Sequence, residues 1–240
     1  MSTSHSQKCA LVLGASGLGG PALLVLSSAG VGRIILVEDG AVETADLSWQ
    51  PLFREADLGR RKASVAAARL GQLFPGGTVE AQDRRLDPAG ALELMRRADV
   101  LVDCSDDFGT KFLASDTAVA TGKPLVHGGL VRYSAQLLTV KPGTTGCLRC
   151  LFEEPPPPGT VPTCAEAGVL GPLAGLVGAL MGAEAVRLLA GERGCYAGRL
   201  VVYEARSARC RAVPVRRRPG CPSCSGVPRR EEPAAAGGFS

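Results

Sequence analysis

Short apolar runs alternate with longer segments in which apolar residues recur at helical spacing, from about residue 9 to residue 130. The runs predict buried strands, because a strand of a parallel sheet is apolar on both faces. The segments between them predict helices that pack on the sheet. The expected strands are residues 9–13, 33–37, 79–82, 100–103 and 124–127, and the expected helices are 21–29, 61–74, 91–97 and 111–121. This alternation predicts an α/β fold, a Rossmann-like, mostly parallel sheet flanked by helices.

The pattern changes in the second half of the chain. Residues 131–140 alternate enough to predict a strand or hairpin, and residues 200–203 predict a late strand. Residues 153–162 are proline-rich and predict an extended loop. The chain is rich in Arg, Pro and Gly from residue 214. No clean boundary divides it, so we expect one domain over residues 1–225 and a disordered tail over 226–240.

An uncharged apolar stretch at residues 167–183 continues as an expected helix to about residue 189. It is slightly short of the roughly 20 residues of a membrane span. It also contains Pro172 and five glycines, which favour a helix packed closely on the sheet over a membrane helix. The polar N-terminus shows no signal-peptide pattern, so we expect a cytoplasmic protein without a membrane span.

Composition narrows the class of protein. The 240 residues are 45% hydrophobic and 21% charged, which is typical of a soluble globular protein. Aromatic residues are only 4%, so the core must consist largely of Ala, Val and Leu. The net charge is +4, and many arginines lie near the C-terminus. No aromatic side chains interleave with them as a nucleic-acid stacking surface requires, so a solvated basic segment is favoured and no nucleic-acid partner is expected. These arginines are Arg206, Arg209, Arg211, Arg216, Arg217, Arg218, Arg229 and Arg230.

A glycine loop follows the first expected strand and precedes the first helix. Gly14, Gly17 and Gly19 would let the backbone approach phosphate groups, and the helix N-terminus offers free N–H groups to an anion. A tight turn without a ligand is the alternative. Glu38 ends the second strand, where an acid can bind ribose hydroxyls.

Two carboxylates follow the strand at residues 100–103. Asp106 and Asp107 would face the ligand crevice and suit Mg²⁺ bound to a triphosphate. The equal alternative is a pair that caps the next helix. Lys62 opens a helix and could reach a phosphate, although lysines at such positions are usually surface residues.

Nine cysteines include two CxxC pairs, Cys147 with Cys150 and Cys221 with Cys224. Two such pairs complete a tetrahedral Cys₄ zinc site, which is structural because it leaves no open coordination position. This zinc would tie the C-terminal tail to the middle of the chain. Four unrelated thiols or a redox pair is the alternative.

Cys164 stands apart, after the proline-rich loop and before the apolar helix. A helix N-terminus favours the thiolate, which would suit a catalytic thiol that forms a thioester or a persulfide. A buried structural cysteine is the equal alternative.

Together these motifs resemble the ThiF/MoeB/HesA family, the bacterial relatives of ubiquitin-activating enzymes. The resemblance covers about residues 8–224. It is carried by LVLGASGLGG (11–20), SAGVGRIILVE (28–38), LGRRK (58–62), LVDCSDD (101–107), the two CxxC pairs, TCAEAGVLGP (163–172) and EAVRLL (184–189).

The resemblance implies ATP-dependent adenylation of the C-terminal Gly-Gly of a ubiquitin-like sulfur-carrier protein. Sulfur would then be loaded from a separate donor, and the molybdopterin, thiamine, cysteine and natural-product routes all fit. It implies ATP, Mg²⁺ and Zn²⁺ as ligands, a homodimer, and catalytic roles for Asp106 and for Cys164 of the family's mobile loop. The implied ATP-site residues are Gly14, Gly17, Gly19, Glu38, Asp46, Lys62, Asp106 and Asp107.

The chain also departs from the family pattern. Asp46 and Trp49 stand where the family has the Asn and Arg of an Asn-x-x-Arg-Gln stretch, and Gly40 replaces a second Asp. Lys111 stands for an Arg, and the chain has no N-terminal Arg-Tyr-x-Arg-Gln motif. These departures keep open a second hypothesis, a catalytically weakened carrier-binding or scaffold homologue beside an active partner. A nicotinamide-dependent dehydrogenase would explain only the glycine loop and the acid.

Overall fold

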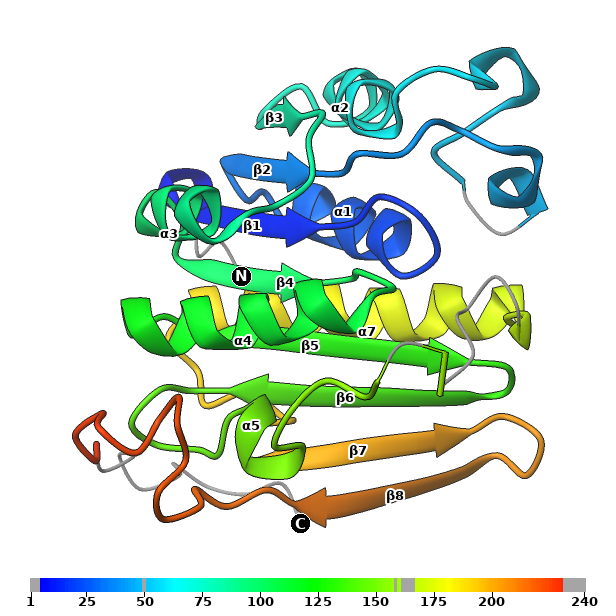
Figure 1. Ribbon diagram of the computed structural model, residues 1–240. Coiled ribbons are helices and arrows are strands. Elements are labelled where there is room, and N and C mark those ends of the chain that lie inside the picture. Colours follow the sequence, from blue (N-terminus) through cyan, green and yellow to red (C-terminus); the bar gives the residue numbers. More distant parts are fainter. Residues whose placement is uncertain (1–4, 49–50, 158, 161–166, 231–240) are drawn as a thin grey trace, which may run out of the picture.

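The computed structural model describes residues 5–48, 51–157, 159–160 and 167–230. These residues build one eight-stranded sheet in the order β3-β2-β1-β4-β5-β6-β7-β8 (Figure 1). Strands β3 to β5 are parallel, and β6, β7 and β8 continue the sheet antiparallel. The strands are β1 (Cys9–Leu13), β2 (Arg33–Val37), β3 (Thr78–Gln82), β4 (Val100–Asp103), β5 (Leu125–Val131), β6 (Ser134–Val140), β7 (Arg199–Glu204) and β8 (Arg209–Pro214).

The predicted parallel α/β sheet is confirmed, and three of its strands, β1, β2 and β4, have the predicted bounds. Each is almost wholly buried, which is why an apolar run marked it in the sequence. The predicted strand or hairpin after residue 130 is a strand, β6, which forms a hairpin with an extended β5. Strand β8 was not predicted. All six of its residues are exposed at the edge of the sheet, so it has no apolar run.

Helices cover both faces of the sheet (Figure 1). One buried cluster joins α1, α2 and α7 to one face, and a second joins α3, α4 and α5 to the other. Both are rich in Ala, Val and Leu, as the low aromatic content predicted. The helices are α1 (Gly19–Ser28), α2 (Lys62–Leu73), α3 (Pro88–Arg96), α4 (Phe108–Thr121), α5 (Leu148–Leu151) and α7 (Gly171–Leu189), with short 3₁₀ turns at His5–Gln7, Thr44–Ser48 and Glu55–Asp57.

The predicted apolar helix is α7, and it packs chiefly on α1 as well as on the sheet. A Cβ at Gly178 would lie 2.3 Å from the Leu18 carbonyl oxygen, and one at Gly182 would lie 2.8 Å from the Val25 Cβ. Glycine is therefore needed for this close approach. Within the described residues, α7 is the one helix long and apolar enough to cross a membrane. Half of its apolar stretch is buried inside the fold. Its packing is that of a core helix.

The C-terminal segment returns to the body of the molecule. Val227 packs against the cluster around α4 and α5, and the Arg230 backbone N–H donates to the Gly143 carbonyl at 3.1 Å. Residues 226–230 thus have defined contacts. The division at residue 225 remains a prediction, since most of the expected tail lies outside the described residues.

Candidate active site and cysteine cluster

The strand register brings the predicted nucleotide residues to one edge of the sheet. Leu13 lies beside Val37 on one side and beside Asp103 on the other, so the segments after β1, β2 and β4 leave the sheet together. Here the chain order also switches direction, from β1 to β2 on one side and from β4 to β5 on the other. Such a switch point is where open α/β sheets bind ligands.

A cleft of about 210 Å³ lies at this edge. It is lined by the first residue of the glycine loop, by acids that follow β2 and β4, and by two arginines that follow β3. The lining residues are Leu13, Gly14, Val37, Glu38, Asp39, Arg84, Arg85, Leu86, Ser105, Asp106, Asp107 and Thr110.

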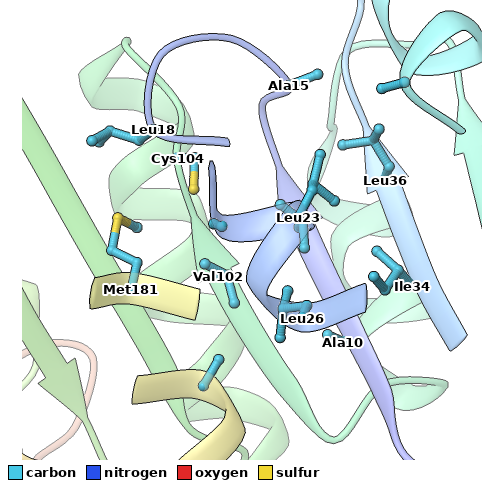
Figure 2. Packing of buried hydrophobic residues seen from close by; sticks show 14 of the residues in the cluster. Ala10, Ala15, Leu18, Leu23, Leu26, Ile34, Leu36, Val102, Cys104 and Met181 are labelled. Carbon is cyan, nitrogen blue, oxygen red and sulfur yellow. The ribbon is translucent and has the colours of Figure 1, made fainter. Parts of the chain in front are cut away.

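The glycines of the loop do different things. A Cβ at Gly14 would lie 2.8 Å from the Cys104 carbonyl oxygen, and one at Gly19 would lie 2.0 Å from the Gly14 carbonyl oxygen. Gly17 has φ +26°, and a Cβ there would meet nothing within 4 Å. Gly14 and Gly19 are therefore needed for the tight turn itself, whereas Gly17 borders open space that a ligand could occupy. Leu18 and Cys104 both belong to the buried cluster on this face of the sheet (Figure 2).

Glu38 connects the loops after β1 and β2. Its Oε2 accepts the Ala15 N–H at 3.0 Å, and its Oε1 accepts the Gly40 N–H at 2.8 Å. A Cβ at Gly40 would lie 3.0 Å from this Oε1, so the absence of a side chain at Gly40 accommodates the longer acid. Because a carboxylate has about four lone-pair positions, Glu38 can still accept hydroxyl groups of a ribose.

Lys62 and Asp46 pair beside the cleft without lining it. Lys62 Nζ lies 3.1 Å from Asp46 Oδ2, and the two side chains are only 13% and 6% exposed. Lys62 also donates its backbone N–H to the Gly40 carbonyl at 3.0 Å. Lys62 is thus a packed residue, and the alternative that it is an ordinary surface lysine is wrong. Its ammonium already has a partner.

The two acids after β4 divide between the two interpretations. Asp107 caps α4, since its Oδ1 accepts the Thr110 N–H at 2.8 Å. Asp106 is exposed to the cleft and has no hydrogen-bond or ion-pair partner among the residues the structure describes. An unpartnered carboxylate in the same cleft as Gly14 has the donor chemistry that Mg²⁺ prefers.

A buried polar network that the sequence did not reveal lies beneath these acids. His127 Nδ1 and Lys111 Nζ lie 2.7 Å and 3.5 Å from Asp103 Oδ2. Lys111 also donates to the carbonyls of Ser105 at 2.6 Å and Gly128 at 2.7 Å. Asp103 accepts the Ser105 N–H at 3.1 Å, so the network fixes the turn that precedes Asp106. A lysine and a histidine in otherwise apolar stretches were the available signal.

Charge is balanced within this network. Burial alone would raise the pKa of Asp103, but the Lys111 charge and the His127 hydrogen bond hold that pKa well below its usual range. Burial lowers the pKa of His127, against the opposing effect of the hydrogen bond that Asp103 accepts from its ring. Burial also raises the pKa of the neighbouring Cys104 thiol, which makes it a poor nucleophile.

The four cysteines of the two CxxC pairs form one cluster. All four Sγ atoms lie within 4.8 Å of one another. The closest separations are 3.8 Å (Cys147–Cys150), 3.7 Å (Cys147–Cys221) and 3.4 Å (Cys150–Cys224). Four thiolates around one Zn²⁺ at about 2.3 Å would be about 3.8 Å apart, so the cluster fits tetrahedral zinc.

Arg217 and Arg218, which the sequence placed in a solvated basic segment, stabilise this cluster. Arg217 donates to the carbonyls of Cys224, Val227 and Gly143, and Arg218 donates its backbone N–H to Cys150 Sγ at 3.3 Å. The cluster thus joins the segment after β8 to α5, as predicted. The other predicted thiol, Cys164, lies outside the described residues, as do Trp49 and Gln50.

Comparison with known proteins gives a consistent result. The model of the ThiF family matches residues 4–223. A sulfur carrier protein adenylyltransferase of Thermus thermophilus is 46% identical over 227 residues, which are 92% of this chain and 84% of the relative. The SAMP-activating enzyme E1 of Haloferax volcanii is 42% identical over 214 residues, covering 89% of this chain and 79% of that enzyme.

The fold is also found among solved structures. The structure of E. coli MccB with AMPCPP and MccA superimposes with a TM-score of 0.81. It covers 91% of this chain and 67% of MccB, at 21% sequence identity. This likeness supports the fold.

Proposed function

This chain belongs to the ThiF family and is an adenylyltransferase of the ubiquitin-activating kind, and on this premise we propose that it adenylates the C-terminal Gly-Gly of a ubiquitin-like sulfur carrier. The observation that carries the proposal is the cleft at the carboxyl edge of the sheet. Gly14, Glu38 and Asp106 line it, and Gly17 borders open space in the adjoining loop.

Each of these residues has a role in the proposed reaction. The backbone at Gly17 binds phosphate oxygens, and Glu38 holds the ribose hydroxyls. Asp106 would hold Mg²⁺, which would neutralise charge on the phosphates. A carboxylate oxygen of the carrier's terminal glycine attacks the α-phosphorus. The bond from the α-phosphorus to the bridging oxygen breaks, and pyrophosphate leaves. Lys62, paired with Asp46, contributes to phosphate binding only after its ammonium turns from that partner.

The cysteine cluster has a structural role in this proposal. Zn²⁺ held by Cys147, Cys150, Cys221 and Cys224 would have no open coordination position, so it supplies no chemistry to the substrate. The thiols fit a reducing compartment, and we propose a cytoplasmic location on that basis.

We also propose the remaining partners from the family. A separate protein donates the sulfur. Cys164 forms a thioester with the carrier by displacing AMP from the acyl-adenylate, or it takes the outer sulfur of a persulfide on the donor, whose thiol leaves. The enzyme is a homodimer, which the outer face of α7 supports. There Pro172, Leu176 and Leu180 are exposed and apolar.

ATP–pyrophosphate exchange with a purified carrier that ends in Gly-Gly tests this proposal. We expect exchange that depends on the carrier and is lost when its terminal glycines are removed. Asp106→Ala should reduce the rate by about 100-fold or more, because the variant loses the carboxylate that holds Mg²⁺. Glu93→Gln, an exposed acid on α3, is the matched control and should exchange normally.

One outcome would decide for the scaffold hypothesis instead. If the protein binds the carrier but catalyses no exchange with any carrier that ends in Gly-Gly, adenylation by this chain alone is wrong. If Cys164→Ala transfers sulfur at the full rate, the proposed covalent role of that thiol is wrong.

A further inference from the structure

The turn that carries Asp106 is held from both sides of one residue, Ser105. The Asp103 carboxylate accepts the Ser105 N–H at 3.1 Å and also accepts the Ser105 hydroxyl. On the other side, the Lys111 ammonium donates to the Ser105 carbonyl at 2.6 Å. Because Ser105 directly precedes Asp106, these contacts fix the main chain from which the Asp106 carboxylate enters the cleft.

Lys111 also ties this turn to the neighbouring strand, β5. Its Nζ donates to the Gly128 carbonyl at 2.7 Å and lies 3.5 Å from Asp103 Oδ2. The side chain is only 10% exposed, and it does not line the cleft. An ammonium has three donors, and here three protein oxygens face it. Lys111 therefore acts within the protein and leaves no donor for a nucleotide.

Through Gly128 the same lysine is linked to the glycine loop. A Cβ at Gly128 would lie 2.3 Å from Met181 Sδ and 3.2 Å from Leu18 Cδ1, so this part of β5 packs closely against both side chains. Leu18 is the last residue of the loop before α1, and it shares one buried cluster with Met181 (Figure 2). Lys111 thus holds Asp106 in a fixed place relative to the loop.

A metal ion shared between a nucleotide and the protein makes strict demands on this arrangement. Mg²⁺ binds oxygen ligands at about 2.1 Å in nearly ideal octahedral geometry, so a carboxylate and the phosphates must be correctly spaced. A carboxylate on a mobile turn would have to be ordered when the metal binds, and that cost weakens binding.

We propose that Lys111 is a positioning residue for the metal–nucleotide complex. By joining Ser105 to Gly128, it holds Asp106 ready for the Mg²⁺ of a bound nucleotide. This inference rests on the role of Asp106 in the proposed function. It adds a residue that lies behind the cleft and acts on the metal only through Asp106.

Equilibrium binding of ATP to the purified protein, titrated with Mg²⁺ and without a carrier, tests the proposal. In Lys111→Met, the Mg²⁺ concentration that gives half of the full gain in ATP affinity should rise about tenfold or more. Groups that orient a metal ligand typically contribute that much to metal affinity. Binding of ATP in excess EDTA and binding of adenosine should not change, because the lining of the cleft is retained.

A second variant separates positioning from folding. Lys111→Met leaves the buried Asp103 carboxylate without the lysine charge, which destabilises the fold. Asp103→Asn combined with Lys111→Met removes both charges and keeps a side-chain oxygen for the Ser105 N–H. This double variant should fold and should show the same rise in the required Mg²⁺ concentration, because the Ser105 carbonyl has still lost its donor.

The matched control is Lys123→Met. Lys123 is also half-buried, and it precedes β5 at the end of the strand that lies away from the cleft. Its Nζ donates to three backbone carbonyls at the end of α3 and just beyond it, those of Met95, Arg96 and Ala98. The variant loses the same kind of contacts, so it should be less stable but keep the wild-type dependence on Mg²⁺.

The possible results are distinct. An unchanged Mg²⁺ dependence in both Lys111 variants would overturn the proposal, and so would an equal loss of ATP affinity with and without Mg²⁺. The same rise in Lys123→Met would also overturn it, since the effect would then be one of general stability. Exchange with a carrier is measured separately. A protein whose Mg²⁺ dependence shifts as expected but which catalyses no exchange would refute only the proposed function.

Discussion

At the residue scale, His127 ties the stability of the protein to pH. The side chain is 6% exposed and faces Asp103, with the Lys111 ammonium on the same carboxylate. Burial lowers the pKa of His127 in the folded protein, whereas an unfolded histidine titrates near pH 6.5. The unfolded chain therefore binds more protons as the pH falls below 6.5, and the folded state loses stability there.

We expect this loss to have a slope of up to about 1.4 kcal/mol per pH unit between pH 6.5 and 5. Asp103, whose pKa is also lowered, adds a loss of the same sign only near and below pH 4. His127→Asn should lower the slope between pH 6.5 and 5 by that amount, as measured by urea unfolding at constant zinc and salt. Gln72→Asn, exposed on α2, should retain it. Equal slopes in all three proteins would show that His127 is not the group responsible.

The glycine loop offers a second contrast between single residues. Gly14→Ala places a methyl group 2.8 Å from a backbone oxygen at φ +93°, so the backbone must move. We expect a loss of about 2 kcal/mol or more in unfolding free energy. Gly17→Ala has φ +26° and open space, so it should cost about 1 kcal/mol and chiefly weaken ATP binding.

Thermal unfolding and ATP binding, measured on both variants, check this contrast. A Gly14→Ala protein as stable as the wild type would contradict the packing argument. A Gly17→Ala protein that binds ATP normally would show that the loop does not approach the phosphates.

The residue scale also shows what motifs cannot reveal. The positions of Gly14, Glu38 and Asp106 could be predicted because each follows a clear apolar strand. That Asp107 caps α4 while Asp106 stays unpartnered could not, because it depends on backbone geometry at the helix start. Likewise, the Lys62–Asp46 pair joins residues whose contact depends on how the intervening loop folds.

At the scale of elements, burial decided what could be predicted. β1, β2 and β4 lie inside the sheet and are apolar except for Arg33 at the start of β2 and Asp103 at the end of β4, so their bounds could be predicted. β8 has one neighbouring strand and exposes every residue, so its sequence carries little hydrophobic signal. α5, with four residues, is too short to show a helical period.

The outer face of α7 leads to a prediction about assembly. Leu176 and Leu180 are 46% and 36% exposed and lie one helical turn apart, with Pro172 and Ala183 exposed on the same stripe. A continuous uncharged stripe is typical of an interface, and a second copy with the same stripe would cover it around a two-fold axis. Leu176→Arg with Leu180→Arg should therefore convert the proposed homodimer to a monomer in sedimentation velocity.

The matched control is Leu73→Arg, since Leu73 is 53% exposed on α2 and lies on another part of the surface. It should leave the dimer intact. A wild-type protein that sediments as a monomer, or a double variant that remains dimeric, would show that α7 is not the interface.

At the scale of the whole molecule, the two halves of the sheet have separate tasks. The cleft lies at the ends of the parallel strands, whereas the cysteine cluster joins α5 to the segment after the antiparallel β8. The sequence predicted that zinc would tie the tail to the middle because the CxxC pairs lie so far apart. It could not show that Arg217 and Arg218 complete the same link, because isolated arginines carry no such signal.

This separation predicts that the zinc link and nucleotide binding can be uncoupled. Cys221→Ser with Cys224→Ser removes half of the ligand set, so the protein should lose its zinc, and residues 216–230 should become sensitive to proteases. ATP binding should persist, because the cleft is built from β1, β2, β4 and the β3–α3 loop.

Metal analysis, limited proteolysis and ATP binding measure the three effects. Cys195→Ser with Cys210→Ser, which changes two exposed thiols outside the cluster, should alter none of them. Zinc retained by the first variant would refute the Cys₄ site, and ATP binding lost together with zinc would show that the antiparallel half supports the cleft.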